Sequence, residues 1–330
     1  MCERGKMPAA LAEQLCNDSG TPAPPLRGVV YRAVSSVGRM FLAILVSIAM
    51  TPLFGADLNR AEKIHFIIGP TDHPPGTHEV AGGARLLKYC VDQTKPAVPA
   101  LQTAIHDGWP ENSEELASAR VIVFSGDQFP PVRFKNSPAI LAQVSRLADA
   151  GCSFVAVHYA TGVNRPFADS AEVRAILDRL FGGFANFIPV AEGGTVPKVM
   201  QATIVPTKAN HPVLRGVMPF SLYDEPYYKN RFAPKSPDNL VTPLATAMVP
   251  PDAPKEEIVA WSLEQQQGRR GVAIVMPHFY RNWNNGDLRK LVLNAIFWAA
   301  KIEIPKSGVS STLPERCYHP NGFQGVRIGV

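Results

Sequence analysis

The sequence predicts an α/β fold in which a mostly parallel sheet carries helices on both faces. Short runs of apolar residues alternate with longer segments whose apolar residues recur at helical spacing. The short runs show no polar alternation, which is typical of strands covered on both faces. Strands of this kind that alternate with helices indicate a parallel sheet built from strand–helix–strand units.

The first half of the predicted domain supplies most of this alternation. Apolar runs predict four strands, at 63–69, 100–105, 121–124 and 153–157. Helical spacing predicts four helices, at 79–93, 113–119, 139–150 and 170–181. Gly151 stands where the third helix should end, since glycine is favoured just beyond a helix C-terminus. Ser170 is a favoured residue type for the N-cap of the fourth.

The segment after Gly183 changes character. Long proline-rich loops separate strands predicted at 198–205, 240–247, 258–263 and 272–276. An amphipathic helix at 287–301 (DLRKLVLNAIFWAAK) is expected to close the domain. We therefore predict one α/β domain over 57–304. The polar, glycine-rich segment 305–330 is expected to be a loosely attached tail.

Residues 1–56 form a separate region. Arg39 precedes an apolar run at 41–50 (FLAILVSIAM), and the small residues Gly55 and Ala56 follow. A basic flank, a short apolar core and a small-residue exit are typical of a secretory signal peptide. We expect an upstream extension plus a signal peptide that ends near Ala56, and a secreted or periplasmic product without stable membrane insertion. An N-terminal membrane anchor is the alternative, although the run is short for a bilayer span.

Composition and motifs exclude several classes of function. The formal net charge is +5, without a dense stripe of Lys and Arg, which argues against nucleic-acid binding. Three cysteines would remain after cleavage, Cys90, Cys152 and Cys317, and their number and spacing match neither a disulfide framework nor a zinc finger. The segment GPTDHPPGTHEV after the first strand lacks G-x-G-x-x-G, which argues against bound NAD.

Histidines gather where the predicted strands end. Ligands of open α/β sheets bind beyond the carboxyl ends of the strands. His78, His158 and His278 follow the first, the fourth and the last predicted strand. Imidazole transfers protons near neutral pH and also ligates metal ions, so the pattern predicts proton transfer, metal binding or hydrogen bonding to a hydroxylated ligand. The same edge also receives His73, His106 and Asp127. Structural roles are expected for His65, His211 and His319.

The segment GCSFVAVHYATG has the pattern of a nucleophile elbow, in which a buried strand enters a sharp turn that raises one side chain above the sheet. The raised residue would be His158. Cys152 stands at the opposite end of the strand, so covalent thiol catalysis is not expected.

A second segment, YDEPYY, places Asp224 and Glu225 among tyrosines. Paired carboxylates serve as a base, as metal ligands or as acceptors for sugar hydroxyls. Tyr227, and Trp283 further along, offer aromatic faces to a ligand. Because short metal-ligand spacings such as His-x-x-x-His are absent from the sequence, any metal site would be assembled from distant segments.

These segments together resemble the ThuA-like (trehalose-utilisation) family of the class I glutamine-amidotransferase-like superfamily. The matching pieces occur in the family's order over about 62–302: GPTDHPPGTHEV, AGCSFVAVHYATG, ANHPVLRGV, SLYDEPYY, GVAIVMPHFYRNW and LVLNAIFWAAK. The resemblance implies a flavodoxin-like, doubly wound fold.

The resemblance also implies roles for single positions. His78 and Glu79 occupy the family's first-loop His-Glu, and His158 stands where the superfamily keeps its cysteine nucleophile. Glutaminase activity is therefore not expected. The other matches are Asp224 and Glu225 on an Asp-Glu pair, and His278 on a Gly-His step whose glycine is replaced by Pro277.

We therefore expect a secreted lyase, hydrolase or isomerase that acts on a small carbohydrate, such as a keto-glycoside or a disaccharide derivative. The expected acid–base groups are His158, His278 and Glu225. The expected substrate-binding residues are His78, Glu79, Asp224, Tyr227 and Trp283. A divalent metal on His78, His158 and His278 is the alternative to proton transfer, and no other cofactor is indicated. A non-catalytic sugar-binding protein and an amidohydrolase remain the competing functions.

Overall fold

The computed structural model describes residues 62–95, 97–236 and 239–319. The predicted signal peptide, with its apolar core at 41–50, lies outside the described residues. Within the described ranges, no helix is both long and apolar enough to cross a membrane.

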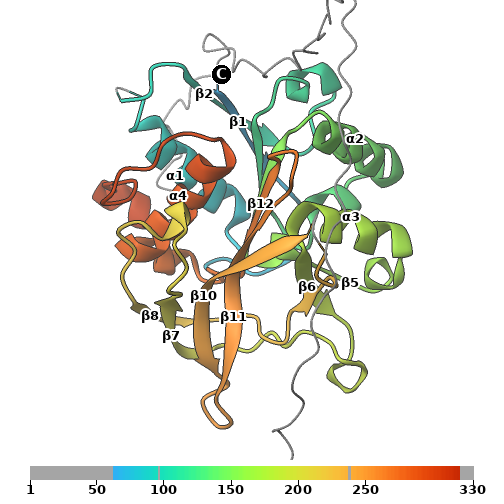
Figure 1. Ribbon diagram of the computed structural model, residues 1–330, viewed down its shortest axis with the longest axis vertical. Coiled ribbons are helices and arrows are strands. Elements are labelled where there is room, and N and C mark those ends of the chain that lie inside the picture. Colours follow the sequence, from blue (N-terminus) through green and yellow to red (C-terminus); the bar gives the residue numbers. More distant parts are fainter. Residues whose placement is uncertain (1–61, 96, 237–238, 320–330) are drawn as a thin grey trace, which may run out of the picture. The chain divides into compact units, whose positions relative to one another are not determined.

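One half of the central sheet is parallel (Figure 1), and the chain segments that form the candidate site follow its strands. Its strands pair side by side in the order β2 (Leu101–Asp107), β1 (Glu62–Ile68), β3 (Val121–Ser125), β4 (Ser153–Val157) and β12 (Arg270–Ile274). β3 and β4 are apolar and almost entirely buried because helices cover both faces. Ser125 pairs with Ile68 and with Val157, and Val157 pairs with Ile274, so four strands end level at one edge.

The other half of the sheet is antiparallel. From β12 it continues through β11 (Lys255–Glu264), β10 (Leu240–Val249), β7 (Met200–Pro206) and β8 (Phe220–Asp224). β7 and β8 alternate buried and exposed residues, as expected where one face is open to solvent. β8 was not predicted, and neither was a small sheet of β5 (Gly162–Asn164), β6 (Gly183–Phe187) and β9 (Arg231–Phe232). These strands are short, so their apolar pattern is weak.

Helices cover both faces of the parallel half, as predicted. Figure 1 shows α1 (Val80–Asp92) and α4 (Gly286–Ala299) on one side, and α2 (Ser137–Asp149) and α3 (Ala171–Phe181) on the other. The Ser170 side chain accepts the Val173 N–H at the start of α3, which confirms the predicted N-cap. The helix predicted at 113–119 is only a 3-10 turn, Ser113–Leu116.

The expectation of a loosely attached tail is wrong for residues 305–319. Val309 and Cys317 are buried, and the Cys317 carbonyl accepts a hydrogen bond from the Tyr280 hydroxyl at 3.0 Å. The Val309 N–H donates to Asn294 Oδ1 of α4 at 2.8 Å. A few buried contacts therefore hold a segment whose overall composition is polar. Cys90, Cys152 and Cys317 are all free thiols.

Asn294 connects the tail, α4 and the loop before β8, so we predict that Asn294→Ala lowers the free energy of unfolding. Its side-chain amide also donates to the carbonyls of Val213 and Arg215, at 2.9 and 3.0 Å. Alanine would leave two buried backbone groups and one partly buried group unpaired, at a cost of about 2–4 kcal/mol. Urea denaturation measures the change. The exposed Asn136, whose side chain makes no capping bond, is the control, and Asn136→Ala should stay within about 0.5 kcal/mol of wild type. Equal effects of the two substitutions would contradict the prediction.

Candidate functional site

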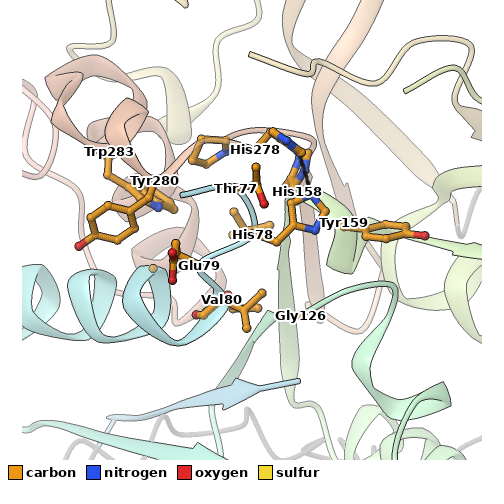
Figure 2. Close-up of a pocket in the computed structure, with 14 residues that line it drawn as sticks. Thr77, His78, Glu79, Val80, Gly126, His158, Tyr159, His278, Tyr280 and Trp283 are labelled. Carbon is orange, nitrogen blue, oxygen red and sulfur yellow. Dashed lines mark hydrogen bonds between the residues drawn. The ribbon is translucent and has the colours of Figure 1, made fainter. Parts of the chain in front are cut away.

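The candidate site lies at the C-terminal ends of β1, β3, β4 and β12, which end at the same level of the sheet. His78 comes from the loop after β1, and His158 directly follows β4. His278 follows β12, and Glu225 follows β8. Figure 2 shows the side chains of His78, His158 and His278 converging from separate segments, with Glu79 on the helix side. His78, His158 and His278, predicted from the strand ends, are therefore brought together. His106, expected at the same edge, lies inside β2 with its Nε2 2.9 Å from His65 Nδ1, away from these three.

His158 occupies the predicted elbow. Its backbone φ is +50°, in the left-handed region that β-carbon residues seldom adopt. The turn is fixed by the Thr161 hydroxyl, which donates to the His158 carbonyl at 2.6 Å. The ring is held by a hydrogen bond from Nδ1 to the Val275 carbonyl at 3.0 Å. As a result, Nε2 is the atom of His158 that faces the other histidines.

Three imidazole nitrogens meet at the centre of the site. His78 Nε2 lies 2.8 Å from His158 Nε2 and 2.8 Å from His278 Nδ1, and the last two atoms are 3.2 Å apart. Glu225 Oε2 stands 3.2 Å from His278 Nδ1 and 3.8 Å from His158 Nε2. The three rings are buried, whereas 17% of the Glu225 side chain is exposed. We call these four residues the histidine cluster.

Asp127 supports the histidine cluster and was missed as a site residue. Its carboxylate accepts hydrogen bonds from His78 Nδ1 at 2.5 Å, from His73 Nδ1 at 2.7 Å and from the Asp72 N–H at 2.7 Å. Burial alone would raise the pKa of Asp127, but the bonds from the two histidines hold that pKa well below its usual range. The available signal was its position directly beyond β3, at the same edge as the histidines.

Burial governs the charge of the rings. It lowers the pKa of His158 well below the usual value, and the neighbouring His78 lowers it further. Burial also lowers the pKa of His78, against the opposing effect of its hydrogen bond to Asp127. The lowered pKa values favour the neutral form of both rings.

Asp224 positions the backbone of the site. Its Oδ1 accepts the N–H groups of His278 and Glu225, at 2.7 and 2.9 Å. The residue is 1% exposed, so it lies behind the cluster and not in the place expected for a substrate contact. Burial raises the pKa of Asp224 to about 6.

The two predicted aromatic contacts are also buried. Tyr227 is 1% exposed, its ring stacks on His158 at 4.7 Å, and its hydroxyl lies 3.0 Å from His158 Nε2. Trp283 is 5% exposed and lines a small pocket. Tyr227 therefore supports His158 and has no free face for a sugar ring.

The pocket next to the cluster has a volume of about 30 Å³, which is room for about two water molecules. Figure 2 shows Tyr280 and Trp283 on one side of it and Tyr159 on the other. Glu79 lines it as well and accepts the Gly76 N–H at 2.6 Å. Tyr159 and Tyr280 were not predicted. The pocket admits an ion, water or one small polar group, but not a sugar ring.

Comparison with known proteins identifies the family. The family model described as "ThuA: Trehalose utilisation" matches residues 83–299. The chain belongs to the ThuA family. The match includes His158, Asp224, Glu225 and His278 of the site, and it begins five residues after His78. No curated protein sequence matches this ThuA chain.

Three solved structures are similar to this chain, and the first of them supports the fold. A ThuA-like protein from Bacteroides uniformis is similar at 15% identity with a TM-score of 0.51, covering 72% of this chain and 91% of its own. A carbohydrate deacetylase is similar at 14% identity and a TM-score of 0.42, over 73% of this chain and 32% of its own. A glutamine amidotransferase from Methylobacillus flagellatus is similar at 9% identity and a TM-score of 0.33, over 78% and 98%. The flavodoxin-like fold class expected for a ThuA protein is confirmed.

This ThuA chain has no reactive thiol at the elbow. Burial raises the pKa of Cys152 to about 12, so the thiol stays protonated, and it lies at the far end of β4.

We predict that Asp127→Asn lowers the free energy of unfolding by about 2–4 kcal/mol, because one amide cannot accept charge-assisted hydrogen bonds from both His73 and His78. Asp72→Asn is the matched control. The Asp72 side chain is 73% exposed and pairs with Arg133, so its loss should cost less than about 1 kcal/mol. Urea denaturation of both variants provides the comparison, and an Asp127→Asn protein as stable as the control would contradict the supporting role of Asp127.

Proposed function

We propose that this ThuA-family protein acts on a carbohydrate, a keto-glycoside or disaccharide derivative, by acid–base chemistry at the histidine cluster. The family's description, trehalose utilisation, supports a carbohydrate as the substrate. The observation that carries the chemistry is the contact of a partly exposed carboxylate, Glu225, with buried imidazole nitrogens at 3.2 and 3.8 Å. The apolar run at 41–50 supports action outside the cytoplasm.

The cluster offers an electrophilic group next to a base. Three imidazole nitrogens within 2.8–3.2 Å cannot all be bare, because their lone pairs repel, and they cannot all be protonated either. We infer that they share a cation, either a proton or a metal ion. A substrate oxygen near that cation is polarised, and Glu225 takes up the proton that the substrate releases. His158 and His278 act by holding the shared cation.

A carbonyl group in the substrate fits these groups. A keto group on a sugar ring acidifies the neighbouring C–H, so a carboxylate can remove that proton and start an elimination or an isomerisation. The pocket of about 30 Å³ has room only for the oxygen-bearing group of such a substrate. The ring would remain on the outer side, where the partly exposed Glu225 and the exposed His73 reach solvent.

The two competing functions fit the site less well. A non-catalytic sugar-binding site needs exposed aromatic faces, but Tyr227 and Trp283 are 1% and 5% exposed. A superfamily-type amidohydrolase needs a reactive thiol, and Cys152 is buried with a raised pKa.

We predict that Glu225→Gln lowers turnover of an accepted sugar at least about 100-fold, the usual contribution of a general base, while the protein stays folded. Glutamine keeps the size of the side chain and removes its basicity. The assay incubates the full chain with trehalose, 3-keto-trehalose and related keto-glycosides, and NMR identifies the products.

Glu256→Gln is the matched control, because Glu256 lies exposed on β11 and its carboxylate accepts a hydrogen bond from the Thr246 hydroxyl at 3.1 Å. It should turn over the sugar at the wild-type rate. A Glu225→Gln protein as active as this control would exclude Glu225 as the base. If the wild type changed none of these sugars, the proposed function itself would be wrong.

A further inference from the structure

The protonation of two rings in the histidine cluster is fixed by their outer partners. The partner of His158 Nδ1 is the Val275 carbonyl oxygen, which can only accept a hydrogen bond. The partner of His78 Nδ1 is the Asp127 carboxylate, which also only accepts. Both Nδ1 atoms therefore carry the hydrogen. In the neutral rings, the two Nε2 atoms are bare acceptors that face each other at 2.8 Å.

Hydrogen bonds inside the site do not remove this conflict. The Tyr227 hydroxyl can donate to His158 Nε2 at 3.0 Å, and His278 Nδ1 can donate to His78 Nε2 at 2.8 Å. Each acceptor then has a donor, but the two Nε2 lone pairs still point at one another at hydrogen-bond distance. An extra proton between them would relieve the repulsion only by forming a buried imidazolium, which burial disfavours.

The charges of the site call for a cation. Glu225 and Asp127 are carboxylates whose ion-pair partners in the described part of the chain are all histidines. In the described residues, the two carboxylates thus lie in or beside a buried cluster without an ion pair to a Lys or Arg side chain. Unbalanced buried charge is costly, and a divalent ion would balance both carboxylates.

We propose that His78 Nε2, His158 Nε2 and His278 Nδ1 bind one divalent transition-metal ion of the Zn²⁺ class, with the Glu225 carboxylate beside the fourth, open position. Three imidazoles favour such an ion over Ca²⁺ or Mg²⁺, which prefer oxygen ligands. This inference deepens the proposed function and rests on it for the role of Glu225 as a base.

The geometry fits such an ion with small adjustments. Nitrogens about 2.0–2.1 Å from a tetrahedral zinc are about 3.3 Å apart. The three distances here are 2.8, 2.8 and 3.2 Å, so each ring has to move outward by only a few tenths of an ångström. Metal-bound histidines usually donate their second N–H to a carboxylate or a backbone carbonyl, and Asp127 and Val275 are such partners for His78 and His158.

The bound ion would replace a shared proton as the electrophilic group of the site. It would polarise a substrate oxygen, or a water molecule, at the open position next to Glu225. The pocket of about 30 Å³ beside the rings is large enough for such small groups.

The test measures metal content of the purified full chain by mass spectrometry, for wild type, His158→Asn, Glu225→Gln and His319→Asn. Asparagine tolerates the left-handed backbone at position 158 and removes the imidazole. His319 is exposed and outside the cluster, so His319→Asn is the matched control. We expect about one ion per chain in wild type, in the control and in Glu225→Gln, and at least about tenfold less in His158→Asn.

A second measurement uses the wild type alone, so it still tests the metal site if His158→Asn does not fold. The wild type is stripped with a chelator and titrated with Zn²⁺ and with Co²⁺, while the melting temperature and the visible Co²⁺ spectrum are followed. We expect Zn²⁺ to raise the melting temperature, because an ion that binds the folded state stabilises it, and Co²⁺ to show nitrogen-ligand bands.

The outcomes separate this inference from the proposed function. A wild type that contains no metal and whose melting temperature does not respond to Zn²⁺ or Co²⁺ would overturn the metal site. Unchanged sugar turnover by chelated, metal-free protein would overturn the role of the ion as the electrophilic group. A protein that binds one ion but changes no sugar would leave the metal site standing and overturn the proposed function.

Discussion

The arrangement of the site depends on the register of four parallel strands. Ile68, Ser125 and Val157 pair across β1, β3 and β4, and Ile274 of β12 pairs with Val157. Because these strands end at the same level, the loops that follow them all begin along one edge of the sheet. Short loops are then enough to bring together His78 and His278, which are 200 positions apart in the sequence. A shift of one residue in any pair would turn the following side chain to the other face of the sheet.

The antiparallel half of the sheet contributes to the site by positioning Asp224 and Glu225. It carries β8 to the point where Asp224 can bind the backbone of the β12 loop, and the next residue, Glu225, then reaches the imidazoles. Asp127 acts in a similar way from the parallel half, since one carboxylate orients both His73 and His78. Two buried acidic residues thus hold the histidines in place, and the more exposed Glu225 is left for chemistry.

Much of the parallel half could be predicted from the sequence, because its strands are purely apolar and its helices carry clear caps, as at Ser170. The convergence of the histidines followed from their positions beyond strand ends. The role of Asp127 could not be predicted, since it depends on two partners that are set by loop geometry. The burial of Tyr227 was missed because sequence does not show which face of a ring is covered. β8 was missed because five residues of alternating polarity beside a proline are a weak signal.

At position 158, the backbone turn determines where the side chain stands, independently of which side chain it is. The left-handed turn is held by Thr161, and its neighbours β4 and β12 are fully paired, so most of the scaffold does not depend on the imidazole itself. Any side chain at this position is delivered to the same point, beside two other imidazoles and a carboxylate. The backbone thus fixes where the side chain of residue 158 stands, whereas the chemistry depends on which side chain it is, so sequence similarity across such a scaffold is a poor guide to shared catalysis.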